Sequence, residues 1–362
     1  SYAQVASGSW SMYGVVYNTV DGDLELSSIL ADTFNVSTAV YSQAFSISGQ
    51  ETAARGLAFN ADGTKMFVVG QTGDDVNEYA LTTGFDVSTA SFTDAFSVAS
   101  QDTNPSGIAF NTDGTKMFVC GYTNDSVYEY TLSTGFDVST STYVDAFSVA
   151  GQEIVPLGLA FNTDGTKMFV CGQDSDNVNE YALTTGFDIS TASFTDAFSI
   201  TPQDTAPQGL GFNTDGTKMF VVGGAGLDIN QYALSTGFDV STSVFTAVFS
   251  VSAQEAAPAD VAFNTDGTKM FVLGRDGADV NEYTVGTEAY TSGYQPVHTT
   301  ASIDSTYWTD INSMTANQAA GDGNVYYCIS TDDRTTWTVI KDVGGERDIV
   351  KNNGGTWQYN SN

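Results

Sequence analysis

Apolar and polar residues alternate along this chain in four short runs, and the set of runs recurs at a fixed spacing. The most regular run, FNTDGTKMFV, stands at Phe110–Val119, Phe161–Val170, Phe212–Val221 and Phe263–Val272, and FNADGTKMFV stands at Phe59–Val68. Each copy starts 51 residues after the previous one. No helical period of 3.6 residues runs through the repeat, so we expect strands and not helices.

The second copy shows what one unit contains. Apolar runs predict strands at Ser106–Phe110, Lys116–Gly121, Ser126–Leu132 and Tyr143–Ala150, named here a, b, c and d in chain order. Between a and b, Asn111–Gly114 has the residues of a type I turn followed by a left-handed glycine. Four short strands in roughly 50 residues are typical of one blade of a β-propeller.

The number of strands predicts how the ring closes. Strands a, b and c occur five times and end at Val280–Val285, whereas the first strand d, within Thr33–Ser48, precedes any strand a. An N-terminal d and a C-terminal a-b-c complete one blade and leave no open end. We therefore expect an all-β propeller of five four-stranded blades. Six blades stay open as an alternative, with eroded strands at Ser11–Asn18, Asp23–Leu30 and Tyr294–Ser302.

The repeats divide the chain into three parts. Residues 33–289 are expected to form the propeller, and residues 1–32 an N-terminal β segment that packs with the C-terminal part. Residues 290–362 are expected to form a small β domain or the start of a further domain. Within them, Asn324–Ser330 and Thr335–Asp342 alternate like the two strands of a hairpin.

Charge narrows the function classes. The chain has 43 acidic and 11 basic residues and a formal net charge of -32. Such a surface repels phosphate backbones and anionic lipid, so we expect no nucleic-acid partner. No apolar run of about 18 residues is present, so we expect no membrane insertion. Cys120 and Cys171 occupy a repeat position where other copies have Val or Leu, which predicts buried free thiols.

The sequence contains no recognisable combination of catalytic residues. The only histidine is His298, outside the regular repeats, and no cluster of His and Cys has the spacing of a zinc site. No copy is expected to depart from its sisters to build a site, so we predict no enzyme, no catalytic residue and no resident metal or cofactor.

A calcium-binding site stays an alternative, because each d-a connection carries an acidic residue directly after a glutamine. Five such carboxylates near the axis could hold a cation, or each could cap its own loop. They are Glu51, Asp102, Glu153, Asp204 and Glu255. In one b-c loop, Asp174 and Asp176 form a second candidate.

The five copies have nearly the same sequence in some loops and different sequences in others. The a-b turns and c-d loops are nearly identical, whereas the d-a connections and b-c loops vary, the latter starting at Gln71, Tyr122, Gln173, Gly224 and Arg275. Variation on one face of a repeat scaffold is typical of a binding surface, with drift in exposed loops as the alternative. We therefore predict binding by Tyr122, Asp174, Asp176 and Arg275, together with the five d-a carboxylates.

Two resemblances bear on function. The segment TDGTKMFV resembles the xDGxxLYV hairpin of lactonase-like and YVTN-type propellers. The FNTDGTKMFV hairpin together with VNEYALTTGFDVSTASFTDAFS at Val76–Ser97, and the C-terminal IVKNNGGTWQYNS, are similar to segments of virion structural proteins of marine tailed phages.

The second resemblance implies a non-enzymatic virion or extracellular protein, a tail or appendage component that attaches to a host-surface glycan or protein. Its partners would be other virion proteins or copies of itself. The alternatives are a secreted or surface binding protein of a marine bacterium, and a lactonase-like hydrolase with an acidic central site.

Overall fold

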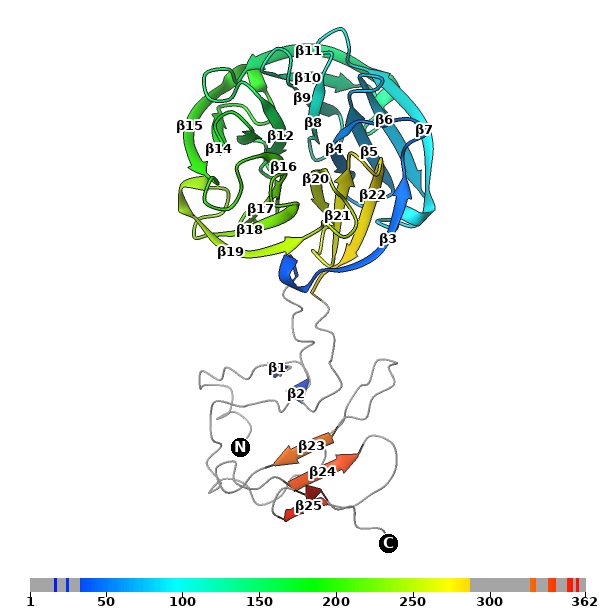
Figure 1. Cartoon of the computed structure of the whole chain (residues 1–362), viewed down its shortest axis with the longest axis vertical. Helices are drawn as coiled ribbons and strands as arrows, with labels where there is room; N and C mark the ends of the chain where they lie inside the picture. The colour runs from blue at the N-terminus through cyan, green and yellow to red at the C-terminus, as the bar shows by residue number, and fades with distance from the viewer. Residues whose placement is uncertain are drawn as a thin grey trace. The chain divides into compact units, whose positions relative to one another are not determined.

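The computed structural model describes residues 33–286 and, outside this range, residues 16–17, 24–25, 326–329, 338–342, 350–353 and 356–357. The chain separates into one unit at Ala31–Ala289 and a second unit formed by Ser1–Leu30 and Tyr290–Asn362. The first unit is a ring of five four-stranded antiparallel sheets (Figure 1). The prediction of an all-β, five-bladed propeller is confirmed.

Each blade runs from an inner strand near the axis to an outer strand on the rim. Blade 1 contains β4 (Ala54–Phe59), β5 (Lys65–Gly70), β6 (Asp75–Leu81) and β7 (Ala90–Ser97). Blade 2 contains β8 (Pro105–Phe110), β9 (Lys116–Gly121), β10 (Ser126–Leu132) and β11 (Ser141–Ser148). Blade 3 contains β12 (Pro156–Phe161), β13 (Lys167–Gly172), β14 (Asn177–Leu183) and β15 (Ala192–Ser199). Blade 4 contains β16 (Pro207–Phe212), β17 (Lys218–Gly223), β18 (Asp228–Leu234) and β19 (Ser243–Ser250).

Blade 5 joins the two ends of the repeat region. It contains β20 (Pro258–Phe263), β21 (Lys269–Gly274), β22 (Asp279–Thr284) and, from the N-terminal side, β3 (Val40–Ser46). The two last strands pair antiparallel, with Val280 opposite Phe45 (Figure 1). The predicted N-terminal closure is therefore confirmed, and the six-bladed alternative is wrong because the ring is complete without another blade.

Short strands outside the ring are described separately. Two of them, β1 (Val16–Tyr17) and β2 (Leu24–Glu25), pair with each other and not with a blade. The predicted C-terminal hairpin is present, because β23 (Tyr326–Ile329) pairs antiparallel with β24 (Thr338–Asp342). Two further strands, β25 (Val350–Asn353) and β26 (Thr356–Trp357), extend this sheet. Tyr294–Ser302 and His298 lie outside the described residues, and the domain assignment of residues 1–32 and 290–362 stays a prediction.

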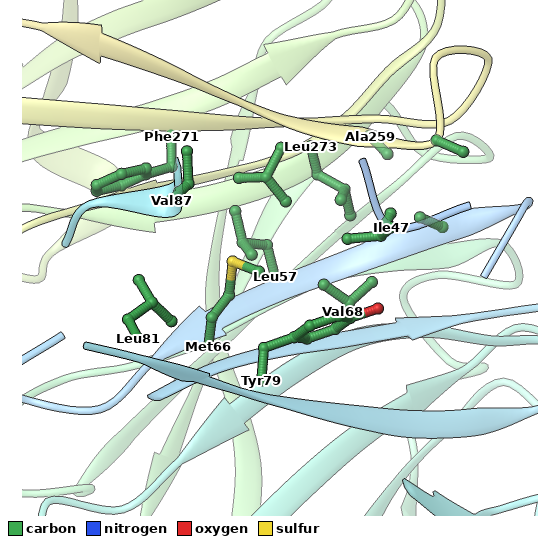
Figure 2. Packing of buried hydrophobic residues seen from close by; sticks show 13 residues of the cluster. Ile47, Leu57, Met66, Val68, Tyr79, Leu81, Val87, Ala259, Phe271 and Leu273 are labelled. Atoms are coloured by element: carbon green, nitrogen blue, oxygen red, sulfur yellow. The ribbon is translucent and has the colours of Figure 1, made fainter. Parts of the chain in front are cut away.

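The hydrophobic core lies between neighbouring blades. Figure 2 shows one such layer, in which Leu57, Met66 and Val68 of blade 1 face Phe271 and Leu273 of blade 5. Because the two middle strands of a blade are covered on both faces, their side chains are almost entirely buried. Cys120 and Cys171 belong to these layers, are fully buried and form no disulfide, as predicted. Burial raises the pKa of the Cys120 thiol to about 12.

One face of the ring, called the turn face, carries the a-b turns and the c-d loops. Each c-d loop contains a short 3-10 turn; the five are η2 (Val36–Thr38), η3 (Val87–Thr89), η4 (Val138–Thr140), η5 (Ile189–Thr191) and η6 (Val240–Thr242). The predicted a-b turn is confirmed, with Gly114 at φ 71°. A Cβ at Gly114 would collide with the ring of Phe136, itself at φ 58°, so the hairpin and the c-d loop fix each other.

On this face, a partly buried Lys–Glu pair within a blade contacts the c-d loop of the next blade. In blade 2, Lys116 Nζ lies 2.7 Å from Glu129 Oε1 and 2.6 Å from the carbonyl oxygen of Phe187 in the next c-d loop. Glu129 Oε2 accepts the backbone N–H of Ile189 at 3.2 Å. Equivalent Lys–Glu pairs occur in blades 1, 3 and 5, whereas blade 4 has Gln231 at the glutamate position. The residues of the turn face that are the same in nearly all copies therefore stabilise the contacts between neighbouring blades.

Candidate functional site

The inner strands approach one another so closely that the axis has almost no room for side chains. A Cβ at Gly56 would lie 2.5 Å from the carbonyl oxygen of Ser106, and one at Gly107 would lie 2.7 Å from that of Leu157. Gly158 and Gly209 hold the same repeat position in blades 3 and 4. In blades 1 to 4, glycine at this point therefore leaves room for the neighbouring inner strand.

The fifth copy breaks this rule with Asp260. Its Oδ2 accepts the backbone N–H of Leu57 at 2.8 Å and its Oδ1 that of Val261 at 2.9 Å, with a third backbone donor from Leu210. The residue is 6% exposed. Burial outweighs these donors and raises the pKa of the carboxyl to about 7. One carboxyl that titrates near neutral pH thus stands on the propeller axis, a property typical of an acid–base catalyst.

A second charged residue on an inner strand is Arg55, one position before Gly56. The sister copies have Ser106, Leu157, Gln208 and Ala259 there. The Arg55 guanidinium donates from Nη2 to Gln71 Oε1 at 3.3 Å, while its buried Nε has no partner. Desolvation, and next the positive charge of Arg275, lower the pKa of Arg55.

The face opposite to the turn face, called the loop face, carries the d-a connections and the b-c loops. Tyr122 and Arg275 open the b-c loops of blades 2 and 5, and both interact electrostatically with Arg55 of blade 1. Tyr122 is 41% exposed, and the nearest carboxylate to Arg275 is Asp276 at 3.9 Å. The structure therefore brings two predicted binding residues together around an arginine that the sequence reading missed.

The five carboxylates of the d-a connections bind backbone N–H groups of their own blades. Asp102 accepts the backbone N–H groups of Asn104 at 2.8 Å, Thr123 at 3.2 Å and Asn124 at 3.0 Å, and so ties the d-a connection to the b-c loop of its own blade. Four further carboxylates bind backbone N–H groups of their own blades in the same way: Glu51, Glu153, Asp204 and Glu255. All five are buried.

This arrangement gives no support to a calcium site formed by the d-a carboxylates. Among the described residues, no group of three His, Cys, Asp or Glu side chains is arranged to hold a metal ion. The other candidates, Asp174 and Asp176, lie beside the blade 3 cap: the Asp174 N–H donates to Glu153, and Asp176 adopts φ 51°. Desolvation, and then Glu153 and Asp204, raise the pKa of Asp176. A ligand-binding role for these acids stays a prediction.

The turn face has a funnel of about 400 Å³ at the mouth of the axis. Its walls repeat from blade to blade, with phenylalanines such as Phe110 and Phe161 and with asparagines and threonines at the rim. No acidic or basic side chain lines it. The funnel is thus nearly symmetric and has no group that could transfer a proton, whereas the loop face has the charged residues that differ between blades.

Comparison with known protein families gives one match. Residues 32–188 match the family described as "Lactonase, 7-bladed beta-propeller". The match spans less than half of the 362-residue chain and includes Arg55 and Tyr122, whereas Asp260 and Arg275 lie beyond it. The ring described here closes with five blades. No curated protein matches the sequence.

Solved structures of other proteins are similar to this chain at low sequence identity. A functionally unknown protein from Desulfotomaculum acetoxidans has 14% identity and a TM-score of 0.42, covering 64% of this chain and 68% of that one. A luciferin-regenerating enzyme has 13% identity and a TM-score of 0.44, covering 67% and 95%. A putative 6-phosphogluconolactonase from Bacteroides uniformis has 16% identity and a TM-score of 0.41, covering 84% and 83%. Likeness at this level carries no inference about activity.

Two expectations from the sequence need correction. The expectation of a protein without enzymatic activity is wrong, because the matched family is one of lactonases. The expectation that no copy departs from its sisters is also wrong, because Asp260 and Arg55 do so on the inner strands. Aligning the five a strands residue by residue would have revealed Asp260, since one acid stands among four glycines, whereas Arg55 occupies a position where all five copies differ. In the part of the chain that the structure describes, no helix is long and apolar enough to cross a membrane.

Proposed function

We propose that this propeller is a lactonase-type hydrolase whose substrate binds at the loop-face mouth of the axis. The observation that carries the proposal is the break in the fivefold repeat, which places one titratable carboxyl and one arginine on inner strands that are otherwise neutral. The lactonase match across residues 32–188 supports the choice of reaction. The acidic central site named among the sequence-based alternatives is then Asp260, and not the five d-a carboxylates.

Hydrolysis of a lactone is accelerated by a base that activates water and by groups that stabilise the negative charge on the carbonyl oxygen. In the proposed reaction, the ionised Asp260 takes a proton from water as the water oxygen bonds to the carbonyl carbon. Negative charge then develops on the carbonyl oxygen as the tetrahedral intermediate forms. The ring C–O bond breaks, the proton passes to the leaving alkoxide, and the product is a hydroxy acid.

The surroundings of Arg55 favour an anionic substrate. Arg55 and Arg275 lie near enough to repel each other, and Arg55 Nε is buried without a partner. Two guanidinium groups can bind a carboxylate or phosphate through paired N–H donors. The exposed ring of Tyr122 would pack against the substrate. A lactone that carries such a group fits this arrangement better than a neutral one.

The repeat itself supplies the test variants, because sister blades already fold with the substituted residues. The full chain is assayed for ring opening of γ- and δ-lactones with and without an anionic substituent. Asp260→Gly, which copies four sister blades, should reduce kcat by at least about 100-fold as expected for loss of a general base. Arg55→Gln, which copies Gln208, should raise KM for the anionic lactones more than for the neutral ones.

An outer-strand carboxylate provides the control. Asp196→Asn on β15 should leave kcat and KM unchanged, because Asp196 lies on the rim. Absence of hydrolysis across the lactone panel, or hydrolysis that survives both Asp260→Gly and Arg55→Gln, would overturn the proposal.

The virion-appendage hypothesis and its host-surface partners have no support from the comparisons. The same holds for the marine and extracellular settings, and these stay predictions from the resemblance alone.

A further inference from the structure

The outer strand of every blade presents a free edge at the rim of the ring (Figure 1). These edge strands are β7, β11, β15, β19 and β3. Each has a register shift against its neighbour, as between Gln231 and Tyr232 opposite β19. Edge strands expose unpaired backbone groups, and proteins protect them with charges and bulges against unwanted pairing.

Three of the five edges carry such a charge. Blades 1, 2 and 3 have Asp94, Asp145 and Asp196 at one position of the outer strand, where blades 4 and 5 have Ala247 and Gln43. Three residues earlier, the first three blades have Ser91, Thr142 and Ser193, where the last two have Val244 and Val40. Adjacent blades have thus lost the same acid and gained the same apolar residue.

The new apolar side chains face solvent. Val244 is 63% exposed, Val248 is 49% exposed and Val40 is 54% exposed. They lie next to the aromatic residues Phe245 and Tyr41, which are also partly exposed. The turn η2, which leads into β3, packs against β19, so these strands belong to neighbouring parts of the rim. We call these five residues the rim strip.

Acidic residues are missing from blades 4 and 5 at other repeat positions as well. In the b-c loops, Asp74, Asp125 and Asp176 correspond to Leu227 and Ala278. In the c-d loops, Asn35 replaces the aspartate of the other four copies. In strand c of blade 4, Gln231 replaces glutamate. Blade 4 has therefore lost acids at several repeat positions, whereas blade 5 keeps Asp260, Asp276 and Asp279, so the loss that both blades share is limited to the outer strand and the b-c loop.

We propose that the rim strip is the contact surface for a second copy of this chain. A partner with basic residues would bind best to a rim that kept its aspartates. A second copy of this chain, with a net charge of -32, would instead bind best to a surface without carboxylates. Two copies related by a twofold axis would place β19 against β19, with apolar side chains in contact and backbone pairing on one side of the bulge.

The experiment measures the mass of the full chain by sedimentation velocity over a series of protein and salt concentrations. Wild type should sediment as a dimer, more tightly at high salt because screening weakens the repulsion between acidic copies. The double variant Val244→Ser/Ala247→Asp gives β19 the residues of β7 at these two positions. Facing like charges in a twofold contact should weaken dimerisation about 100-fold.

Two measurements separate a lost contact from a lost fold. The double variant should keep the unfolding temperature of the wild-type monomer, since sister strands fold with these residues. Asp145→Asn on β11 removes one acid outside the strip and should leave the dimer dissociation constant unchanged. Wild type that is monomeric at every concentration and salt, or a dimer equally tight in the double variant, contradicts the proposal.

Discussion

The turn face and the loop face are built on the same strands but are held together in different ways. On the turn face, side chains carry contacts both within and between blades: Lys116 pairs with Glu129 of its own blade and reaches the next c-d loop, and Phe136 covers Gly114 of its own blade. On the loop face, Asp102 holds main-chain N–H groups of both loops of its blade. A backbone N–H is available from almost any residue, so these loops can change their side chains without losing their support.

This difference teaches where to look for function in a repeat protein. Identity between copies on the turn face reflects interlocking side chains and says nothing about a ligand. Departures from the repeat, such as Asp260 and Arg55 on the inner strands and Val244 on the rim, are not needed to form a blade, because sister blades lack them. We therefore place the proposed chemistry and the proposed contact between copies at such departures.

The largest expected effect concerns Asp260, which lies between the two faces. Its folded-state pKa of about 7 is above the ordinary value, so its contribution to stability is full below the ordinary pKa and is lost as the pH rises through about 7. The raised pKa corresponds to a change of about 4 kcal/mol in the free energy of unfolding between the ordinary pKa and pH 7. Asp260→Gly should therefore gain stability relative to wild type between pH 4 and pH 8, measured by urea unfolding at each pH.

Comparing the two proteins at each pH removes the background from the other acids, which both share. The kcat/KM for lactone hydrolysis should rise with an apparent pKa near 7 in the same range, because the base must be ionised. A stability difference that is constant between pH 4 and pH 8 would show that the carboxyl ionises at its ordinary pKa.

The next effect tests the interlocking of the turn face. Glu129→Ala leaves Lys116 without its carboxylate partner and the Ile189 N–H without an acceptor, which should cost about 3 kcal/mol in urea unfolding. Glu129→Gln should cost less, because Gln231 fills this place in blade 4. On the loop face, Asp102→Ala should cost about 2 kcal/mol, since water can reach part of the released N–H groups. A larger loss from Asp102→Ala than from Glu129→Ala would reverse the comparison between the faces.

The smallest effect concerns a chain of threonine hydroxyls on the turn face. Thr112, Thr163, Thr214 and Thr265 each donate from Oγ1 to the carbonyl oxygen of the next turn, the last to Ala61. Ala61 has no hydroxyl to continue the chain to Thr112. Ala61→Thr should stabilise the ring by about 0.5–1 kcal/mol and raise Tm by about 2 °C, measured by calorimetry. Thr265→Ala should lower Tm by a similar amount; an unchanged Tm in both variants would show that these exposed bonds contribute nothing.

Much of the fold could be predicted because the repeat makes each element visible five times. Strands Lys116–Gly121 and Ser126–Leu132 were predicted with their observed bounds, and the closure by β3 followed from counting strands. The outer strand was displaced by two residues, to Ser141–Ser148, because its alternation continues into the d-a connection and does not mark an end. The candidate site was predicted only in part: Tyr122 and Arg275 were selected as variable loop residues, but Arg55 and Asp260 were overlooked.

The sequence by itself determined the blade and its repetition, since turn residues and alternating apolar positions are local properties of the backbone. Only the tertiary structure decided what Asp260 and Arg55 mean. An aspartate in place of glycine is an unremarkable change in one strand, and its burial on the axis arises because inner strands of different blades meet there. Arg55 and Arg275 are 220 residues apart in the chain, and closure of the ring brings them close enough for one charge to lower the pKa of the other.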